Sequence, residues 1–225
     1  ATKDGLMKKT TLESYSRPRA NGIIALGLRE GDRLIRVTLT DGNSQMLVAS
    51  YNGKVVRFPE DTVRPMGRTA TGVRAIKLDE DGQDRVVGMI CVEEGSKDTV
   101  LVISDKGYGK RTLLDDETGE PIYRITNRGG KGVKTMNLTD KTGNLIGMEA
   151  VNDDQDLMLI TKSGTAIRMD MSSISVLGRA TQGVKLIELQ KRNDTLMFGC
   201  VVPKEETEEA TAEEVTAEET TTTEE

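Results

Sequence analysis

Short apolar runs separated by glycine-containing turns are the main pattern along the chain. The runs "QMLVAS" (45–50), "TVLVIS" (99–104) and "LMLIT" (157–161) are rich in Val, Ile, Leu and Met, and they lead into Asn-Gly, Lys-Gly and Ser-Gly turns. Runs of this length bounded by such turns predict β-hairpins. No long segment carries apolar residues at the 3.6-residue period of a helix, so the predicted fold class is all-β.

One unit of this pattern occurs four times. The segments "TKDGLMKKTTL" (2–12), "SYNGKVVRFPE" (50–60), "SDKGYGKRTLL" (104–114) and "TKSGTAIRMDM" (161–171) align on a turn glycine, and these glycines are 48, 54 and 57 residues apart. A cation follows each glycine by four residues. A second glycine comes next in every unit, within "ANGIIALGL", "ATGVRAIKL", "GKGVKTMNL" and "TQGVKLIEL". Each unit ends with an apolar run that predicts a strand, at 33–39, 85–92, 144–151 and 195–202.

The repeat predicts a propeller-like array of about four four-stranded blades. The units span residues 1–43, 44–97, 98–154 and 155–203. One four-stranded sheet cannot bury its own apolar face, so neighbouring blades must cover each other. The leading strand of the first unit has shrunk to "AT". We therefore expect residue 1 to lie inside a longer array.

The charge is divided unevenly between the body and the C-terminal end. The chain of 225 residues has a net charge of -6, but ten of its 37 acidic residues lie in "EETEEATAEEVTAEETTTTEE" (205–225), which has no cation. The other 27 acids face 31 cations, so the body has a net charge of +4. A segment of Thr, Glu and Ala without large apolar residues cannot bury enough surface to fold. We expect 204–225 to be a disordered acidic tail that competes with a polyanion for the cations of the body.

The cations of the body recur at matching places. Strand alternation predicts that the cation at the fourth position after each turn glycine points outward, and that its apolar neighbours in the strand point inward. More cations cluster around the second glycine of each unit. The candidate binding residues are Lys9, Arg17, Arg19, Arg57, Arg64, Arg68, Arg74, Lys77, Arg111, Arg124, Arg128, Lys131, Lys134, Arg168, Arg179 and Lys185. A curved array with a repeated basic edge suits a long polyanion, most simply duplex DNA held by its phosphates. A propeller that binds an acidic protein partner is the alternative.

Catalytic, metal and membrane functions find little support in the composition. The chain has no histidine, which removes the usual general base and most zinc sites. No nucleophile and base recur together, so we predict no catalytic residue, no metal and no cofactor. The two cysteines, Cys91 and Cys200, lie in apolar runs and are expected to be buried free thiols. No apolar run approaches the roughly 20 residues of a membrane span.

The stretch "TNRGGKG" (126–132) needs its own interpretation. A nucleotide P-loop requires G-x-x-x-x-G-K-[ST] between a strand and a helix. Here Lys131 is followed by Gly132 and Val133, with neither the hydroxyl residue nor a helical pattern. We predict a loop in which Gly129, Gly130 and Gly132 let backbone N–H groups approach a phosphate while the two cations supply charge.

The repeats resemble a known family. "NGKVVRF", "RPMGRTATGVRAIKL", "GYGKRT" and "ISVLGRATQGVKLI" are similar to the C-terminal DNA-wrapping domain of the bacterial DNA gyrase A subunit, over about residues 1–203. The family's signature box reads Q-R-R-G-G-K-G, and this chain matches it from Arg128 to Gly132. The resemblance implies a six-bladed β-pinwheel whose blades exchange strands. It also implies a basic rim that wraps DNA and supports negative supercoiling by an ATP-dependent type II topoisomerase.

Two departures qualify what the resemblance implies. The family's box lies in the first blade, whereas here it lies in the third unit, and only four units are present, as in the last four of six blades. The breakage-reunion domain is absent, so no tyrosine of this chain is given the catalytic role. The implied partners are duplex DNA and, within an A2B2 holoenzyme, the gyrase B subunit together with the rest of the gyrase A subunit. The implied location is cytoplasmic and nucleoid-associated. The topoisomerase IV A subunit has a similar domain with weaker boxes and is the alternative within this group.

Overall fold

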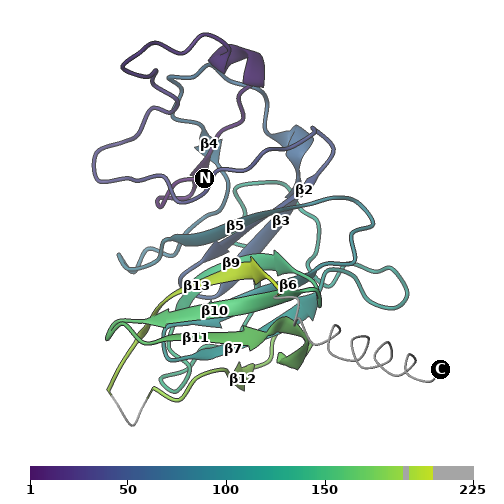
Figure 1. Cartoon of the computed structure of the whole chain (residues 1–225). Helices are drawn as coiled ribbons and strands as arrows, with labels where there is room; N and C mark the ends of the chain where they lie inside the picture. The colour runs from purple at the N-terminus through teal and green to yellow at the C-terminus, as the bar shows by residue number, and fades with distance from the viewer. Residues whose placement is uncertain (190–192, 205–225) are drawn as a thin grey trace, which may run out of the picture.

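The apolar runs of the sequence form antiparallel strands, and Figure 1 shows them stacked as successive sheets. This computed structural model describes residues 1–189 and 193–204, and within them there is no α-helix. The expected acidic tail lies outside the described residues, apart from Lys204. The leading strands are β2 (Gln45–Ser50), β6 (Thr99–Ser104) and β10 (Gln155–Thr161). Each turns at its glycine into β3 (Lys54–Pro59), β7 (Tyr108–Leu113) or β11 (Ala166–Asp170).

The apolar run that ends each unit pairs with the other edge of the leading strand. These strands are β5 (Val86–Val92), β9 (Leu145–Val151) and β13 (Leu196–Pro203). They pair antiparallel with β2, β6 and β10. Short 3-10 turns occur at η1 (Leu12–Tyr15), η2 (Glu60–Thr62) and η3 (Met171–Ser173). The predicted all-β blade array is confirmed.

The sheets are completed by exchange of a strand between units. β8 (Val133–Lys134) belongs to the third unit but pairs with β3 of the second. β12 (Val184–Lys185) pairs in the same way with β7 of the third unit, and β4 (Val73–Arg74) pairs with β1 (Leu6–Met7) of the first. The second glycine of each unit stands just before the exchanged strand. A Cβ on Gly132 would lie 2.5 Å from the Val55 carbonyl oxygen, so the close approach of the two units requires glycine there.

Two parts of the array differ from the expected four-stranded blades. The sheet of the last unit has the order β11-β10-β13, because β11 has no further strand partner among the described residues. In the first unit the segment 33–39 was expected to be a strand, but it forms only an isolated bridge between Thr2 and Leu34. Its equivalents pair with a leading strand of six or seven residues, whereas the described residues at the matching position are only Ala1 and Thr2. The apolar side chains of Leu34, Val37 and Leu39 are therefore exposed.

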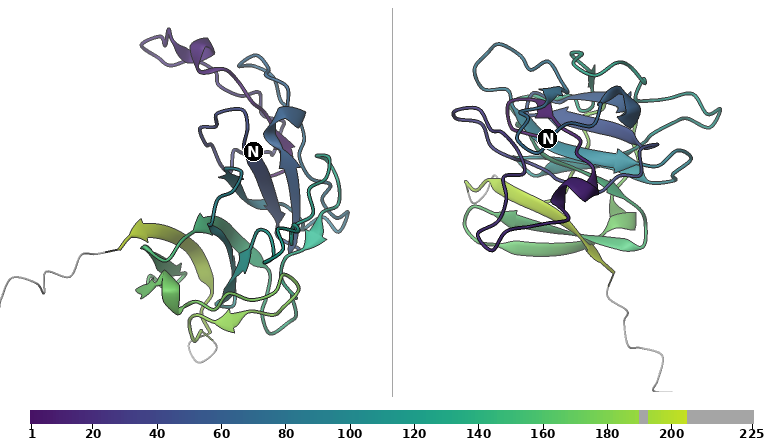
Figure 2. Two further views of the ribbon diagram at one scale, coloured as in Figure 1. Left: turned by 90° about the vertical axis from the view of Figure 1, so that its right-hand side faces the viewer. Right: turned by 90° about the horizontal axis from the view of Figure 1, so that it is seen from above.

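The core lies between the sheets. β5 packs against β9, and β9 packs against β13. Figure 2 shows the sheets following one another along an arc. Because a sheet in the middle of the stack is covered on both faces, residues of both strand parities are buried. Val55 and Val56 are each 1% exposed although their side chains point to opposite faces.

Candidate functional site

The cations four residues after each turn glycine form what we call the inner row: Lys9, Arg57, Arg111 and Arg168. Arg57 and Arg111 are only 7% and 6% exposed, so the expectation that they point outward is wrong. Alternation separates inside from outside only where one face of a sheet meets solvent, and these sheets are covered on both faces.

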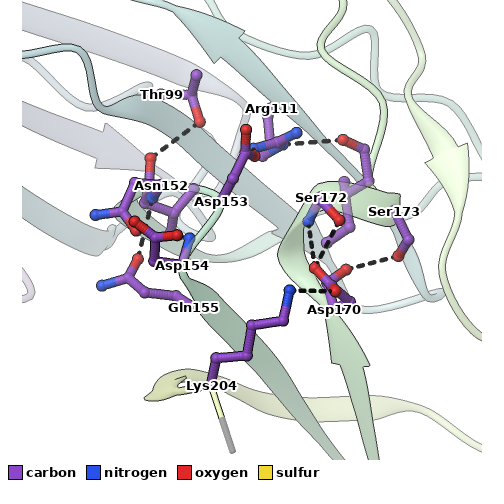
Figure 3. A network of polar contacts seen from close by, with 12 residues as sticks. Thr99, Arg111, Asn152, Asp153, Asp154, Gln155, Asp170, Ser172, Ser173 and Lys204 are labelled. Carbon is purple, nitrogen blue, oxygen red and sulfur yellow. Dashed lines mark hydrogen bonds and ion pairs between the residues drawn. The ribbon is translucent and has the colours of Figure 1, made fainter. Parts of the chain in front are cut away.

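The inner row is paired with acids. Arg57 Nη1 donates to Asp115 Oδ1 at 2.7 Å, and Arg111 Nη1 donates to Asp153 Oδ1 at 2.5 Å, as Figure 3 shows for the second pair. Backbone carbonyls accept further bonds, since Arg57 also donates to Leu114 O and Arg111 to Ile174 O. These contacts satisfy part of each buried guanidinium group, which is otherwise costly to bury, although Arg57 Nε has no partner among the described residues.

The two ends of the inner row are less enclosed but are also paired. Lys9 Nζ lies 3.2 Å from Glu60 Oε1, and Arg168 Nε donates to Asp156 Oδ2 at 2.7 Å. The candidate binding residues of this row therefore serve first to hold the fold.

The segments 64–72, 124–132 and 175–183, here called the second, third and fourth loops, each dock on the preceding unit in the same way. An arginine of the loop donates to the carbonyl of the residue two after the second glycine of that unit. The pairs are Arg68 with Ile24 O (3.3 Å), Arg128 with Arg74 O (3.2 Å) and Arg179 with Lys134 O (2.5 Å). A loop carbonyl accepts a bond in return, from Gly27 N to Ala70 O, from Lys77 N to Gly130 O and from Asn137 N to Thr181 O. The loops thus form a linked chain from unit to unit.

Exposed cations accompany this chain of loops. The residues two after the second glycine are Arg74, Lys134 and Lys185, here called the outer row, and all three are exposed. Lys185 Nζ contacts Glu188 Oε2 at 2.6 Å. The other exposed candidates are Arg17, Arg19, Arg64, Lys77, Arg124 and Lys131. The arginines that dock the loops link the outer row, because Arg128 reaches the backbone of Arg74 and Arg179 reaches that of Lys134.

The third loop contains the stretch "TNRGGKG". It borders a pocket of about 430 Å³ that Val55, Val56 and Arg124 also line. Gly129 has a φ of +79°, a left-handed conformation that favours glycine. Its N–H donates to Ala75 O at 2.6 Å. This N–H is therefore not available for a phosphate, contrary to the expectation from the sequence. Gly130 does not have a positive φ, and a Cβ there would meet only ordinary contacts.

Sequence reasoning missed two lysines below these loops. Lys110 is 0% exposed, and burial and then the charge of Arg179 lower its pKa to about 8. Lys8 lies at the matching position of the first unit, and its pKa is lowered by burial and then by Arg68. The sequence did contain a sign of these lysines, because the same position, three residues after the turn glycine, carries the apolar Val56 and Ile167 in the other units.

Other reactive groups of the described residues have structural surroundings. Tyr123 is fully buried, its hydroxyl lies 2.7 Å from Thr135 Oγ1, and burial raises its pKa. Cys91 and Cys200 are free and half-buried. Residues 1–189 and 193–204 contain no group of three or more His, Cys, Asp or Glu that could hold a metal ion. No helix in the same ranges is long and apolar enough to cross a membrane.

Comparison with known proteins decides the family. The family model described as the DNA gyrase C-terminal domain, a beta-propeller, matches four times, at residues 1–41, 45–93, 98–152 and 155–198. The chain belongs to this family.

The chain is also similar to individual members of the family. The DNA gyrase A subunit of Staphylococcus aureus (strain NCTC 8325 / PS 47) is 44% identical over 211 residues, which cover 94% of this chain and 23% of that protein. For strain MRSA252 the identity is 47% over 189 residues, covering 84% of this chain and 20% of the relative. The chain thus spans less than a quarter of the length of these relatives.

Solved structures share the fold. The crystal structure of the C-terminal domain of DNA topoisomerase IV has a TM-score of 0.80 at 22% identity, covering 90% of this chain and 60% of that one. The structure of the DNA gyrase A C-terminal domain has a TM-score of 0.74 at 23% identity, covering 89% and 64%. These likenesses support the pinwheel architecture.

Proposed function

We propose that this chain binds duplex DNA through its phosphates, without sequence preference, and wraps it as the C-terminal domain of the DNA gyrase A subunit. The observation that carries the proposal is the outer row. Arg74, Lys134 and Lys185 are exposed at the same position of three successive units. A repeated exposed cation on a curved array matches the repeated charge of a DNA backbone.

The docking arginines strengthen this surface. Arg128 uses Nε and Nη1 for backbone carbonyls of Thr62 and Arg74, and within the described residues its Nη2 group has no protein partner. The same side chain can therefore hold the loop in place and still donate to a phosphate. Such a side chain is already ordered, so binding costs little side-chain entropy.

The arc of sheets in Figure 2 supports wrapping. DNA that follows exposed cations from unit to unit must bend with the array. Smooth bending of a short duplex costs about 1–6 kcal/mol, which additional phosphate contacts along the arc offset. A modest preference for easily bent duplexes follows, without direct readout of bases.

The proposed function also includes the enzyme of which this domain would be a part. Wrapping by this domain would support negative supercoiling by a type II topoisomerase in which the B subunit and the rest of the A subunit form an A2B2 complex. We assign no catalytic residue, metal or cofactor to this chain, and place it in the cytoplasm with the nucleoid.

The test is the salt dependence of binding to short duplexes of several sequences. If about six phosphates are neutralised, the slope of log affinity against log salt is about -5, and affinity falls about a thousandfold between 50 and 200 mM salt. Affinities for the different duplexes should agree within a small factor. A flat salt dependence would contradict phosphate binding. A glutamate-rich peptide that binds more tightly than DNA would favour the acidic protein partner instead.

A further inference from the structure

The second and fourth loops each enclose a lysine ammonium group from the preceding unit. Lys110 Nζ donates to Gly178 O at 2.5 Å, to Arg179 O at 2.6 Å and to Thr181 Oγ1 at 3.2 Å. Lys8 Nζ donates to Gly67 O at 3.2 Å and to Arg68 O at 2.5 Å. In both loops the ammonium group thus contacts two successive carbonyls of one turn.

The third loop has no such lysine. Val56 stands at the position of Lys8 and Lys110, three residues after the turn glycine, and it is 1% exposed. The pocket bordered by the third loop lies beside this side chain. An apolar group offers no bond to a carbonyl, so nothing comparable fixes the turn from below.

The turns differ accordingly. In the second and fourth loops the turn closes with bonds from Ala70 N to Gly67 O and from Thr181 N to Gly178 O, and its third residue, Thr69 or Ala180, does not have a positive φ. In the third loop the equivalent residue, Gly129, has a φ of +79°. These are the signs of type I and type II turns, which differ by reversal of the central peptide. The lysine thus accompanies one peptide orientation, and valine accompanies the other.

A reversal of the central peptide would break different contacts in the two kinds of loop. In the fourth loop it would take the Arg179 carbonyl away from a buried ammonium group, which needs its acceptors. In the third loop no ammonium group is affected, and the reversal would take the Gly129 N–H away from the Ala75 carbonyl, a single hydrogen bond between neutral groups. Gly130 adds backbone freedom there, because a residue without a Cβ has few forbidden conformations, and packing does not require glycine at this position, since a Cβ would have its nearest neighbour at 3.8 Å.

We propose that the lysine three residues after the turn glycine is a positioning residue that fixes the next unit's loop in one turn form, and that the third loop, which has Val56 instead, changes its turn when it binds a polyanion. The second half rests on the proposed function. The first half concerns the free protein alone.

Hydrogen exchange of the full chain without DNA tests the first half of the proposal, that the lysine holds the next unit's loop in one turn form. This fixing of the loop is called the lock below. Amides of the fourth loop should exchange more slowly than those of the third. Lys110→Met should raise exchange in the fourth loop by about tenfold and leave the third unchanged, while the exposed control Lys162→Met changes neither. Exchange in the fourth loop that is the same in Lys110→Met and in the wild type would overturn the lock.

A gain-of-lock variant covers the case in which Lys110→Met does not fold. Val56→Lys combined with Gly129→Ala places a lysine and an alanine where the fourth unit's turn has Lys110 and Ala180. Exchange of amides 127–132 should fall by about tenfold. Gly129→Ala alone should not produce this protection, so equal exchange in the single and double variants would also overturn the lock.

The same measurement with a bound 40-base-pair duplex at low salt tests the second half. The wild type should show its largest change in exchange within 127–132, and the double variant should lose most of this change while it still binds. Equal changes in all three loops would overturn the adjustable third loop. Failure of the duplex to bind at 50 mM salt would overturn the proposed function and this half together, whereas the DNA-free comparison still decides the lock.

Discussion

The inner and outer rows of cations have the same regularity in sequence and opposite places in the structure. Arg57 and Arg111 of the inner row are buried and paired with Asp115 and Asp153. The outer row is exposed and runs beside the linked loops. A cation that recurs at the same position of every repeat unit therefore shows that the repeated fold needs a cation there. The recurrence does not show whether the cation contacts a ligand or a carboxylate of the same chain.

The acids that pair with the inner row explain why this distinction was hidden. Asp115 lies 58 residues after Arg57, and Asp153 lies 42 residues after Arg111. Such a spacing is not recognisable as a pair without the blade arrangement. The outer row has no comparable partner for Arg74 or Lys134 in the described residues, and this difference separates a structural cation from a candidate ligand-binding one.

The largest expected effect is on stability, from the inner row. Arg57→Ala and Arg111→Ala should each lower the free energy of unfolding by about 3 kcal/mol, because each leaves buried carbonyls and an acid without their donor. Urea unfolding of each variant measures this. The exposed Arg124→Ala is the control and should stay within about 0.5 kcal/mol of the wild type. Unchanged stability with lost DNA affinity would reverse our assignment of the two rows.

The outer row should affect binding instead. A triple variant of Arg74, Lys134 and Lys185 to alanine should make the salt slope shallower by up to about three, one for each phosphate that is no longer neutralised. Its unfolding free energy should change by less than about 0.5 kcal/mol for each residue. A matched variant of Lys97, Lys141 and Lys162, which are exposed in other turns, controls for the loss of net charge. If both triple variants weaken binding equally, the outer row has no special place on the DNA path.

The two central glycines of the third loop should behave differently. Gly129→Ala places a side chain at a positive φ and should cost about 1 kcal/mol. Gly130→Ala meets only ordinary contacts, without a positive φ, and should be neutral or slightly stabilising. Thermal unfolding compares the two variants. Equal losses would show that the loop is held more tightly at Gly130 than its surroundings indicate.

The smallest effect concerns an exposed pair that resembles the inner row without its burial. Lys204 donates to Asp170 at 2.6 Å, as Figure 3 shows, and this bond together with Ser172 lowers the pKa of Asp170 to about 2. A carboxyl with a lowered pKa stabilises the fold at pH values above its ordinary pKa, and this contribution is lost as the pH falls through about 2. The urea midpoint of the wild type should fall slightly more than that of Asp170→Asn between pH 5 and pH 2. Parallel curves would show that the pair contributes nothing.

Much of the fold followed from the sequence because hairpin turns are local. The turn glycines located the leading strands, and the period predicted stacked blades. The segment 33–39 does not form a strand, because its pairing depends on a leading strand of which the described residues include only Ala1 and Thr2. That dependence lies outside the segment itself. Exchange of strands between units was likewise implied only by the resemblance, because the two residues of β8 carry no strand signal of their own.

The candidate site was predictable only in part. The outer row and the docking arginines lie next to recurrent glycines and were found by alignment of the units. The roles of Arg57 and Lys110 depend on burial by a neighbouring sheet, which a two-residue alternation cannot express. A lysine such as Lys110, at a position that is apolar in other units, is the local sign that a cluster of internal carbonyl groups accepts its hydrogen bonds.

Strand exchange also sets an order for folding during synthesis. The second sheet is complete only when β8 pairs with β3, so the ribosome must have produced residue 134 before the edge formed by residues 54–59 is covered. The third sheet waits in the same way for β12. At each stage the newest sheet presents an open edge to solvent, and open edges are where strands of other chains add. In a nascent chain of this kind, the strand that covers the edge of one sheet belongs to a unit whose own sheet edge is still uncovered. A stall in translation between two units would therefore leave a sheet edge that is prone to aggregation.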